Sequence, residues 1–264
     1  MLKKRETVPG KLSSNSESIL QFGDPGTARD FLERESYVIS YNRRDRVASW
    51  TGEHLTADSL KTGDGVDRDH SKFKEDPDVP SLFRSTLADY SGSGFDRGHM
   101  APAGDAVATQ PAMDQTFYLS NMSPQVGIGF NRHYWAYLEG FCRSLTKKFS
   151  DVYVFTGPLF LPTKGSDGKY TVTYNVLRGN VAVPTHFYKV ILVPQSDNKY
   201  AYGAFILPNQ AIDTKTPLTN FKVKLTDVEK ASGLTFFDKL DVATLGDLCE
   251  ATTCAVSSSG GGDA

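Results

Sequence analysis

The chain has 264 residues, a nearly balanced charge of 29 Lys and Arg against 31 Asp and Glu, and three Cys. This length is enough for one large domain with a sizeable core. The few cysteines and the lack of a long apolar run exclude a disulfide-dense scaffold and predict no integral membrane segment. The balanced total neither supports nor excludes nucleic-acid binding, because holding a polyanion requires only a basic groove.

Composition divides the chain into three parts. Residues 1–18 are polar and poor in hydrophobic side chains, which predicts a flexible N-terminal segment. A single folded domain is expected over residues 19–240, followed by a C-terminal extension and flexible tail over 241–264. Cys249 and Cys254 are close enough in sequence to pair, but the sequence leaves their redox state open.

The expected elements are mostly strands, with one strong helix in the middle of the chain. Residues 28–35 indicate a short helix or a structured lead-in, and residues 81–90 a helix or a loop. Apolar residues at three- and four-residue steps predict the main helix over 132–149, and a shorter helix starts at Val228 and ends at Gly233. Strands are expected at residues 37–41, 47–50, 116–119, 152–155, 170–177, 182–193 and 201–206. This order predicts an α+β domain with a central, largely antiparallel sheet flanked by helices.

The most informative motif is Asp96-Arg97-Gly98-His99. An imidazole is the side chain best suited to accept a proton at neutral pH, and a guanidinium binds a phosphate through two parallel hydrogen bonds. A base beside a phosphate clamp therefore suggests phosphodiester hydrolysis.

Downstream amides supply what a metal-assisted hydrolase needs, which is an oxygen ligand for a hard cation. Asn121 and Asn131 are the candidates. On the helix that follows, Asn131, Trp135, Glu139 and Arg143 are each four residues apart and form one slowly drifting stripe. Because Mg²⁺ keeps most of its waters, one amide oxygen with a nearby carboxylate would suffice.

Three segments resemble the DNA/RNA non-specific endonucleases, and among them the mitochondrial endonuclease G branch in its fungal form. They read FDRGHMAPA at residues 95–103, AMDQTFYLSNM at 112–122 and FNR at 130–132. The likeness extends from about residue 37 to about residue 237. It implies a nuclease domain over 19–240, a central sheet with flanking helices, and a ββα-metal finger running from the His99 region through the Asn131 helix.

The resemblance also implies a role for each matching residue. His99 is the expected general base, which takes a proton from the attacking water. Asn131 is the expected direct ligand of a divalent cation, Mg²⁺ or else Mn²⁺. Glu139 would orient the waters of that cation, and Arg97 and Arg143 would lie near the scissile phosphate.

Two further positions follow from the same likeness. Asn121 matches an amide that supports the site, and Asp96 is expected to hold its neighbours in place. The family's upstream arginine cannot be placed from the sequence, because Arg68, Lys72 and Lys74 are all candidates.

Each site residue also has a structural interpretation that the sequence leaves open. Asn131 could cap the following helix, and Glu139 could be a solvated helix residue. Arg143 could belong to a basic helix end, and Asn121 could form a turn. No His or Cys cluster has the spacing of a zinc site.

The function implied is a metal-dependent endonuclease that cuts DNA and RNA with little sequence preference and leaves 5′-phosphate and 3′-hydroxyl ends. The family further implies a homodimer and a mitochondrial location. Its Arg-rich presequence is not seen, so we expect Met1 to stand upstream of the mature start. Two alternatives remain, namely a nucleic-acid-binding protein of this fold without catalysis and a protein-interaction module, such as a dimerising apoptotic partner.

Overall fold

A computed structural model describes residues 29–257, so the flexible segment predicted at 1–18 and most of the predicted tail lie outside the described residues. The central sheet consists of β1 (Arg29–Glu33), β2 (Tyr37–Asn42), β3 (Val47–Leu55), β6 (Val152–Leu159), β11 (His186–Pro194), β12 (Tyr200–Pro208), β13 (Lys222–Val223) and β14 (Gly246–Asp247). The strand order is β1-β2-β3-β6-β11-β12-β13, with β14 beside β12. Each pair is antiparallel except β12 with β14, which confirms the predicted α+β class.

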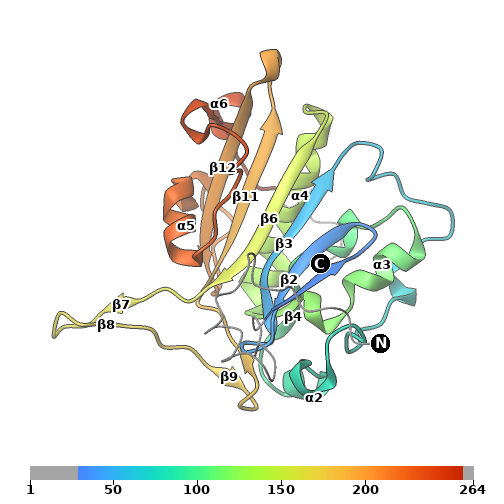
Figure 1. Ribbon diagram of the computed structural model, residues 1–264, viewed down its shortest axis with the longest axis vertical. Coiled ribbons are helices and arrows are strands. Elements are labelled where there is room, and N and C mark those ends of the chain that lie inside the picture. Colours follow the sequence, from blue (N-terminus) through green and yellow to red (C-terminus); the bar gives the residue numbers. More distant parts are fainter. Residues whose placement is uncertain (1–28, 258–264) are drawn as a thin grey trace, which may run out of the picture.

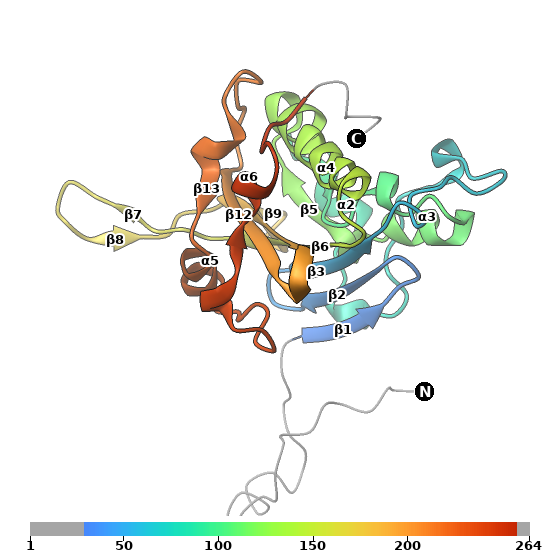
Figure 2. The same cartoon turned by 90° about the horizontal axis from the view of Figure 1, so that it is seen from above.

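Both faces of the sheet are covered. Figure 2 shows α4 (Ala136–Ser144) on one side of the sheet and α5 (Leu225–Ser232) on the other. Side chains alternate along β11, so Phe187 and Ile191 join the large core shared with α4, whereas Val190 joins a smaller core beneath α5. One face of the sheet therefore packs against α4, the helix that follows the Asp-Arg-Gly-His motif in the chain.

The motif lies in a second, two-stranded sheet made of β4 (Asp96–His99) and β5 (Met122–Gln125), which pair antiparallel. After β5 the chain enters a π-helical stretch, Gly127–Trp135, which continues directly into α4. Two strands and a helix in this order form the ββα finger that the resemblance implied. Figure 2 shows β5, the partner of β4, and α4 on the same side of the central sheet.

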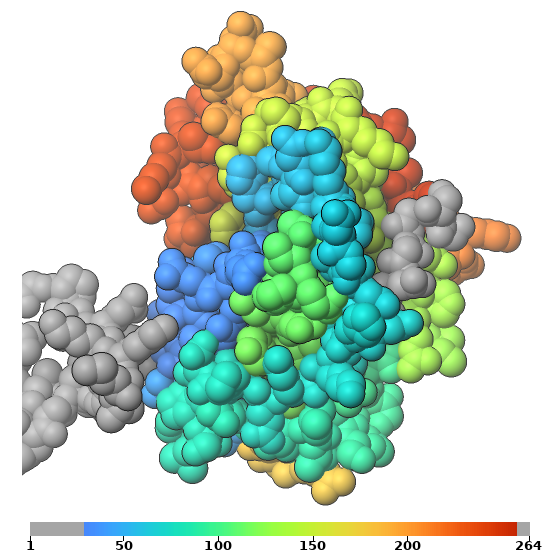
Figure 3. Space-filling model, turned by 90° about the vertical axis from the view of Figure 1, so that its right-hand side faces the viewer, coloured from blue at the N-terminus to red at the C-terminus, as the bar shows by residue number. Residues whose placement is uncertain are grey.

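The connection between β4 and β5 is helical. It contains a 3₁₀ turn at Ala103–Asp105, the helix α3 (Gln110–Thr116) and a further 3₁₀ turn at Leu119–Asn121. Residues 56–80, in cyan in Figure 3, lie beside α3, in green. Backbone contacts hold them there, including a bridge between Lys74 and Tyr118. This packing brings residues that precede the motif by about thirty positions close to it.

The remaining elements are short. The hairpin of β7 and β8 projects from the body (Figure 1), and its turn contains Asp167 and Gly168, which has a left-handed φ of 79°. Apart from 3₁₀ turns, these elements are α2 (Leu87–Tyr90), β7 (Thr163–Lys164), β8 (Tyr170–Thr171), β9 (Val176–Leu177), β10 (Val181–Ala182) and α6 (Leu248–Ala251). No helix within residues 29–257 has the length and apolar character needed to span a membrane.

A predicted strand and a predicted helical alternative are wrong. Residues 116–119 are not a strand, because Thr109 caps a helix with its side chain, accepting from the Ala112 N–H, and that helix runs to Thr116. Within residues 28–35, the helical alternative is wrong, and the structured lead-in contains the edge strand β1. Pairing with β2 decides this, since five residues of β1 match five of β2 in register and only Leu32 is buried.

Other predictions are right in kind but differ in extent. The strand expected at 170–177 is reduced to β8 and β9, and that at 182–193 is divided into β10 and β11. The helix expected over 132–149 is α-helical only in α4, between the π-helical stretch and a 3₁₀ turn at Leu145–Lys147. The helix α5 ends, as predicted, at Gly233, which has a left-handed φ of 72°.

The cysteines are now assigned. Cys249 and Cys254 form a disulfide with their Cα atoms 5.1 Å apart, so the question that the sequence left open is answered in favour of pairing. Cys142 is a buried free thiol in the large core.

Gly129, at the start of the π-helical stretch, offers a test of how closely the finger is packed. Its φ is +86°, and an added Cβ would lie 2.5 Å from the Cβ and 2.9 Å from the Cα of Ala211. We expect Gly129→Ala to lower the free energy of unfolding by about 3 kcal/mol, because it combines a left-handed φ with a backbone clash. Denaturant titration monitored by circular dichroism measures this change.

Gly168→Ala is the matched control, since Gly168 has a φ of +79° but no atom within 4 Å of an added Cβ. It should cost only the conformational part, about 1 kcal/mol. Equal losses in the two variants would show that the contact with Ala211 is unimportant.

Candidate active site

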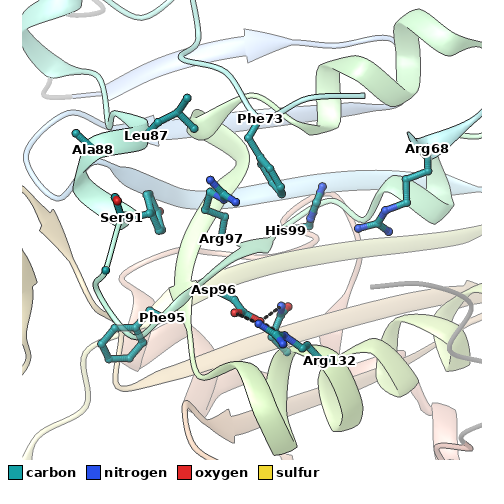
Figure 4. A pocket seen from close by; sticks show the side chains of 13 residues that line it. Arg68, Phe73, Leu87, Ala88, Ser91, Phe95, Asp96, Arg97, His99 and Arg132 are labelled. Carbon is teal, nitrogen blue, oxygen red and sulfur yellow. Dashed lines mark hydrogen bonds and ion pairs between the residues drawn. The ribbon is translucent and has the colours of Figure 1, made fainter. Parts of the chain in front are cut away.

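A pocket of about 830 Å³ opens beside β4. It is lined by Arg68, Phe73, Leu87, Ala88, Tyr90, Ser91, Gly92, Phe95, Asp96, Arg97, His99, Asn131 and Arg132. Figure 4 shows Arg68 and His99 toward one end, Arg97 and Phe73 in the middle, and Leu87, Ala88, Ser91 and Phe95 toward the other. Of the predicted site residues, the structure brings Arg97, His99 and Asn131 into this pocket, whereas Asn121, Glu139 and Arg143 do not line it.

The strand geometry of β4 places the two key side chains. Alternate residues of a strand point to the same face, so Arg97 and His99 project together. Gly98 between them faces Gln125 of β5, and an added Cβ there would lie 2.1 Å from Gln125 Oε1. The glycine of the motif is therefore needed because a buried side chain occupies the space that any other residue would fill.

His99 is held in an apolar, nearly closed environment. It is 9% exposed, its ring centroid lies 4.9 Å from that of Phe117 and 5.8 Å from that of Phe73, and Nε2 has no hydrogen-bond partner among residues 29–257. Burial, with a smaller effect of the Arg68 charge, lowers the pKa of His99 to about 3. The imidazole is thus neutral at physiological pH and able to accept a proton.

Arginines stack on the same two phenylalanines. The Arg97 guanidinium carbon lies 4.2 Å from the ring centroid of Phe73, and that of Arg68 lies 5.6 Å from the ring centroid of Phe117. Figure 4 shows the two guanidinium groups on opposite sides of the His99 ring. A phosphate between them would meet two cations next to the imidazole.

Of the three candidates for the upstream arginine, only Arg68 lies at the pocket. Arg68 lines the pocket and influences the His99 charge, whereas Lys72 and Lys74 do not line it. Lys74 instead lies over the Tyr118 ring, 4.9 Å from its centroid. Sequence reasoning missed Phe73 as a wall of the site, because its role depends on the packing of a long loop.

Asp96 organises the other end of the motif. Its Oδ2 accepts a hydrogen bond of 3.0 Å from Asn131 Nδ2, and its carboxylate accepts a bidentate pair of 2.7 and 2.8 Å from Arg132. The hydrogen bond with Arg132 is the main reason that the pKa of Asp96 is lowered. The Asn131 amide nitrogen is thus committed to Asp96, which leaves its Oδ1 as the side-chain atom that could bind a cation.

Asn131 does not cap a helix. Its N–H donates to the carbonyl of Val126, five residues earlier, so Asn131 lies inside the π-helical stretch. Its side chain is a donor to Asp96 and not an acceptor from the next turn. The capping interpretation left open by the sequence is therefore wrong.

Glu139 and Arg143 are buried behind the pocket. Glu139 is 6% exposed, and burial raises its pKa to about 7, opposed by the charges of Lys189 and Arg143. Arg143 Nη1 donates to Asp105 Oδ1 over 2.8 Å, with only 19% of its side chain exposed. Neither residue belongs to a solvated helix end. Arg68 connects this group to the pocket, since its charge acts on both His99 and Glu139.

Asn121 connects two backbone segments. It is fully buried, and Nδ2 donates to the carbonyls of Ala101 and Thr116 over 2.9 and 2.8 Å, while Oδ1 accepts from the Ala101 N–H over 3.0 Å. These bonds hold the chain just after His99 against the end of α3. The side chain is therefore placed to support the position of His99 from behind.

The donor set can be compared with the cation that the fold implies. Residues 29–257 contain no group of three or more His, Cys, Asp or Glu side chains able to hold a metal. The pocket instead offers the amide oxygen of Asn131, with the carboxyl group of Glu139 behind it. Few oxygen donors fit a hard, strongly hydrated divalent cation, which keeps most of its waters. The residues present therefore fit Mg²⁺ or Mn²⁺.

Comparisons with known proteins agree with this geometry. The family model described as DNA/RNA non-specific endonuclease matches residues 15–243. The chain is 98% identical over 252 residues to Nuclease C1 of Cunninghamella echinulata var. echinulata, covering 96% of this chain and all of that protein. It is 46% identical to the mitochondrial nuclease of Saccharomyces cerevisiae, covering 89% of this chain and 74% of that protein.

A solved structure is similar along most of its length. It is the crystal structure of the EndoG/EndoGI complex, which concerns the mechanism of EndoG inhibition, and it matches with a TM-score of 0.80 and 47% identity. The match covers 89% of this chain and 96% of the other. This chain therefore belongs to the DNA/RNA non-specific endonucleases, in their endonuclease G-like branch, and is a nuclease.

Proposed function

We propose that this chain is a divalent-metal-dependent endonuclease that hydrolyses phosphodiester bonds of DNA and RNA and leaves 5′-phosphate and 3′-hydroxyl ends. The observation that carries the proposal is the neutral His99 imidazole, whose Nε2 is unpartnered and whose ring stands between Arg68 and Arg97. The buried Nε2 of His99 forms no hydrogen bond that would stabilise the fold, and the ring lies next to a site suited to phosphate.

His99 acts as the general base in this proposal. It takes a proton from the water that attacks phosphorus, and the aromatic rings of Phe73 and Phe117 limit competing solvent. Arg68 and Arg97 bind the non-bridging phosphate oxygens. Arg143 adds positive charge from behind the pocket. Asp96 holds Asn131, which would be the ligand for Mg²⁺ or Mn²⁺, and Glu139 would orient water at that cation. The bound cation would supply charge stabilisation for the transition state and the leaving 3′ oxygen.

Low sequence preference follows from the kind of contact. Arginine and imidazole groups in the pocket address phosphate, which is the same at every step of a strand. The two functions that compete with this one are a binding module of the same fold without catalysis and a protein-interaction module. Neither explains why an unpartnered imidazole is retained between two arginines.

We also propose a cellular location and an oligomeric state for the enzyme. Relatives from yeasts, a nematode and vertebrates are described as mitochondrial, which supports a mitochondrial location for this chain. A homodimer is expected from the family.

The general-base role can be tested by plasmid nicking. We expect His99→Ala to abolish the Mg²⁺-dependent relaxation of supercoiled plasmid, by a factor of at least about 10² in rate, while the fold and DNA binding remain. EDTA should abolish cleavage by the wild-type protein. His54→Ala is the control, because His54 is exposed, stacks on Tyr153 and lies outside the pocket. Full activity of His99→Ala would reject the role, and inactive, folded wild-type protein with Mg²⁺ or Mn²⁺ would favour the binding modules.

The ligand role of Asn131 can be tested by metal titration. Asn131→Ala removes the amide oxygen, so we expect either loss of turnover or a rise of about tenfold or more in the Mg²⁺ concentration needed for half-maximal rate. Asn220→Ala, at an exposed position in a 3₁₀ turn, is the matched control. An unchanged titration curve for Asn131→Ala would remove this residue as a ligand.

The protonation of His99 should also appear in the pH dependence of stability. The folded pKa of about 3 lies below the ordinary value of 6.5, so the unfolded chain binds more protons between these limits. This contribution is present above pH 6.5 and is lost as the pH falls toward 3, at about 1.4 kcal/mol for each pH unit. In metal-free buffer, His99→Gln should show a correspondingly shallower loss of unfolding free energy between pH 6.5 and 4.5. Identical slopes would mean that His99 is not buried as a neutral group.

A further inference from the structure

A cluster of charged side chains lies buried between the central sheet and α4, behind the catalytic pocket. Its carboxyl groups and its lysine are each at most 6% exposed, and its arginine is mostly buried. The members come from β3, the 3₁₀ turn after β4, α4 and β11, and they are Glu53, Asp105, Glu139, Arg143 and Lys189.

The register of the sheet creates this cluster. Thr51 of β3 pairs with Thr156 of β6, which pairs with Lys189 of β11, so the three side chains form one row on the same face. Lys189 Nζ donates to Thr156 Oγ1 over 2.9 Å and lies 4.8 Å from the Trp135 ring centroid. Glu53 is two residues beyond Thr51 on the same strand and therefore shares that face.

The charges in the cluster do not balance if every group is ionised. Three carboxyl groups face two buried cations, and an unpaired buried charge is strongly destabilising. A proton retained by one carboxyl group removes the excess. Arg68 also acts on Glu139, but from the partly exposed pocket side.

The contacts indicate which carboxyl group keeps the proton. Asp105 accepts from the Arg143 guanidinium, which favours a carboxylate. The Glu53 side chain is in hydrogen-bonding contact with Asp105, and its buried Oε2 receives no hydrogen bond from a donor among the described residues. A carboxyl group beside a carboxylate can bond to it only by donating a proton. Glu53 is the group that can do so without breaking an ion pair.

The wider surroundings of Glu53 agree with a neutral acid. Burial, together with the neighbouring Asp105 and Glu139, raises the pKa of Glu53 well above its usual range, and Lys189 opposes them. The other titratable groups facing Glu53 are the Tyr37 hydroxyl on β2 and the Cys142 thiol on α4, and burial raises the pKa of both.

We infer that Glu53 is a positioning residue for the reaction, a neutral acid that donates a hydrogen bond to Asp105 and thereby holds Asp105 against Arg143. The inference rests on the proposed function, in which Arg143 supports the phosphate site from behind the pocket. The Arg143 guanidinium is closely confined on another side, since Nη1 lies 3.2 Å from the position of an added Cβ on Gly104. A change in the Asp105 carboxylate is therefore transmitted to Arg143.

Two variants of similar size separate the donor from the bulk of the side chain. Glu53→Gln keeps an N–H donor for Asp105, whereas Glu53→Met does not. We expect kcat with Mg²⁺ to stay within about twofold of wild type for Glu53→Gln and to fall by about tenfold for Glu53→Met, with KM little changed, because one charge-assisted hydrogen bond is lost. Melting temperatures establish that both proteins are folded.

A double-mutant cycle tests whether Glu53 acts through Arg143. In an Arg143→Ala background, Glu53→Met should cause no further loss of kcat, whereas a merely structural effect would persist there. Independent losses in the two backgrounds would overturn the inference.

Infrared difference spectra give a readout that needs no activity and no stable Glu53→Met protein. At about pH 9, where Glu139 with its pKa of about 7 is ionised, the wild-type protein should show the C=O stretching band of a buried protonated carboxylic acid, and Glu53→Gln should lack it. Absence of the band from the wild type, or its persistence in Glu53→Gln, would overturn the inference. Failure of the wild-type protein to cleave DNA would instead reject the proposed function, and the infrared band would still decide the state of Glu53.

Discussion

The carboxylate of Asp96 joins the strand half of the finger to its helical half, and the geometry of the site depends on this junction. It accepts hydrogen bonds from Asn131 and Arg132, which lie more than thirty residues later in the chain. Because Asp96 starts β4 and His99 ends it, one short strand sets the spacing between the proposed base and the amide oxygen. The adjoining π-helical stretch places Asn131 in the pocket, while Trp135 packs in the core.

Burial gives the site its protonation states. Burial beside Phe73 and Phe117 lowers the pKa of His99 and keeps its imidazole unprotonated at neutral pH. Behind His99, burial raises the pKa of Glu139 to about 7, and the charges of Lys189 and Arg143 oppose this rise. A base that stays unprotonated and a buried carboxyl group poised near neutrality are suited to a reaction that moves protons at a phosphate.

Electrostatic recognition is local in this protein. The whole chain carries a formal charge of −2, yet three arginines and one aspartate line the pocket. A nucleic acid would therefore meet a basic patch on a nearly neutral molecule, and binding would rely on that patch instead of on a general attraction. Stacking of Arg68 and Arg97 on phenylalanine rings holds the guanidinium planes in place and so limits the entropy lost on binding phosphate.

The sequence alone determined the features that depend on neighbouring residues. The Asp-Arg-Gly-His motif and the Phe-Asn pair identified His99, Arg97 and Asn131, and alternation and the glycine at position 233 predicted most strands and the end of α5. Predictions from short segments failed where other parts of the chain decide the local structure. Residues 116–119 have β-forming side chains, but they lie at the end of a well-capped helix and not in a strand.

Only the tertiary structure decided which residues meet across the fold. It placed Arg68 at the pocket and not Lys72 or Lys74, made Phe73 a wall of the pocket, and showed Glu139 and Arg143 to be buried beside Asp105. It also brought Glu53 and Lys189 together behind the site through the pairing of β3, β6 and β11. The spacing of apolar residues in a sequence shows whether a segment is a helix or a strand. Contacts between elements depend instead on strand register and side-chain packing, and no local sequence pattern encodes these distances.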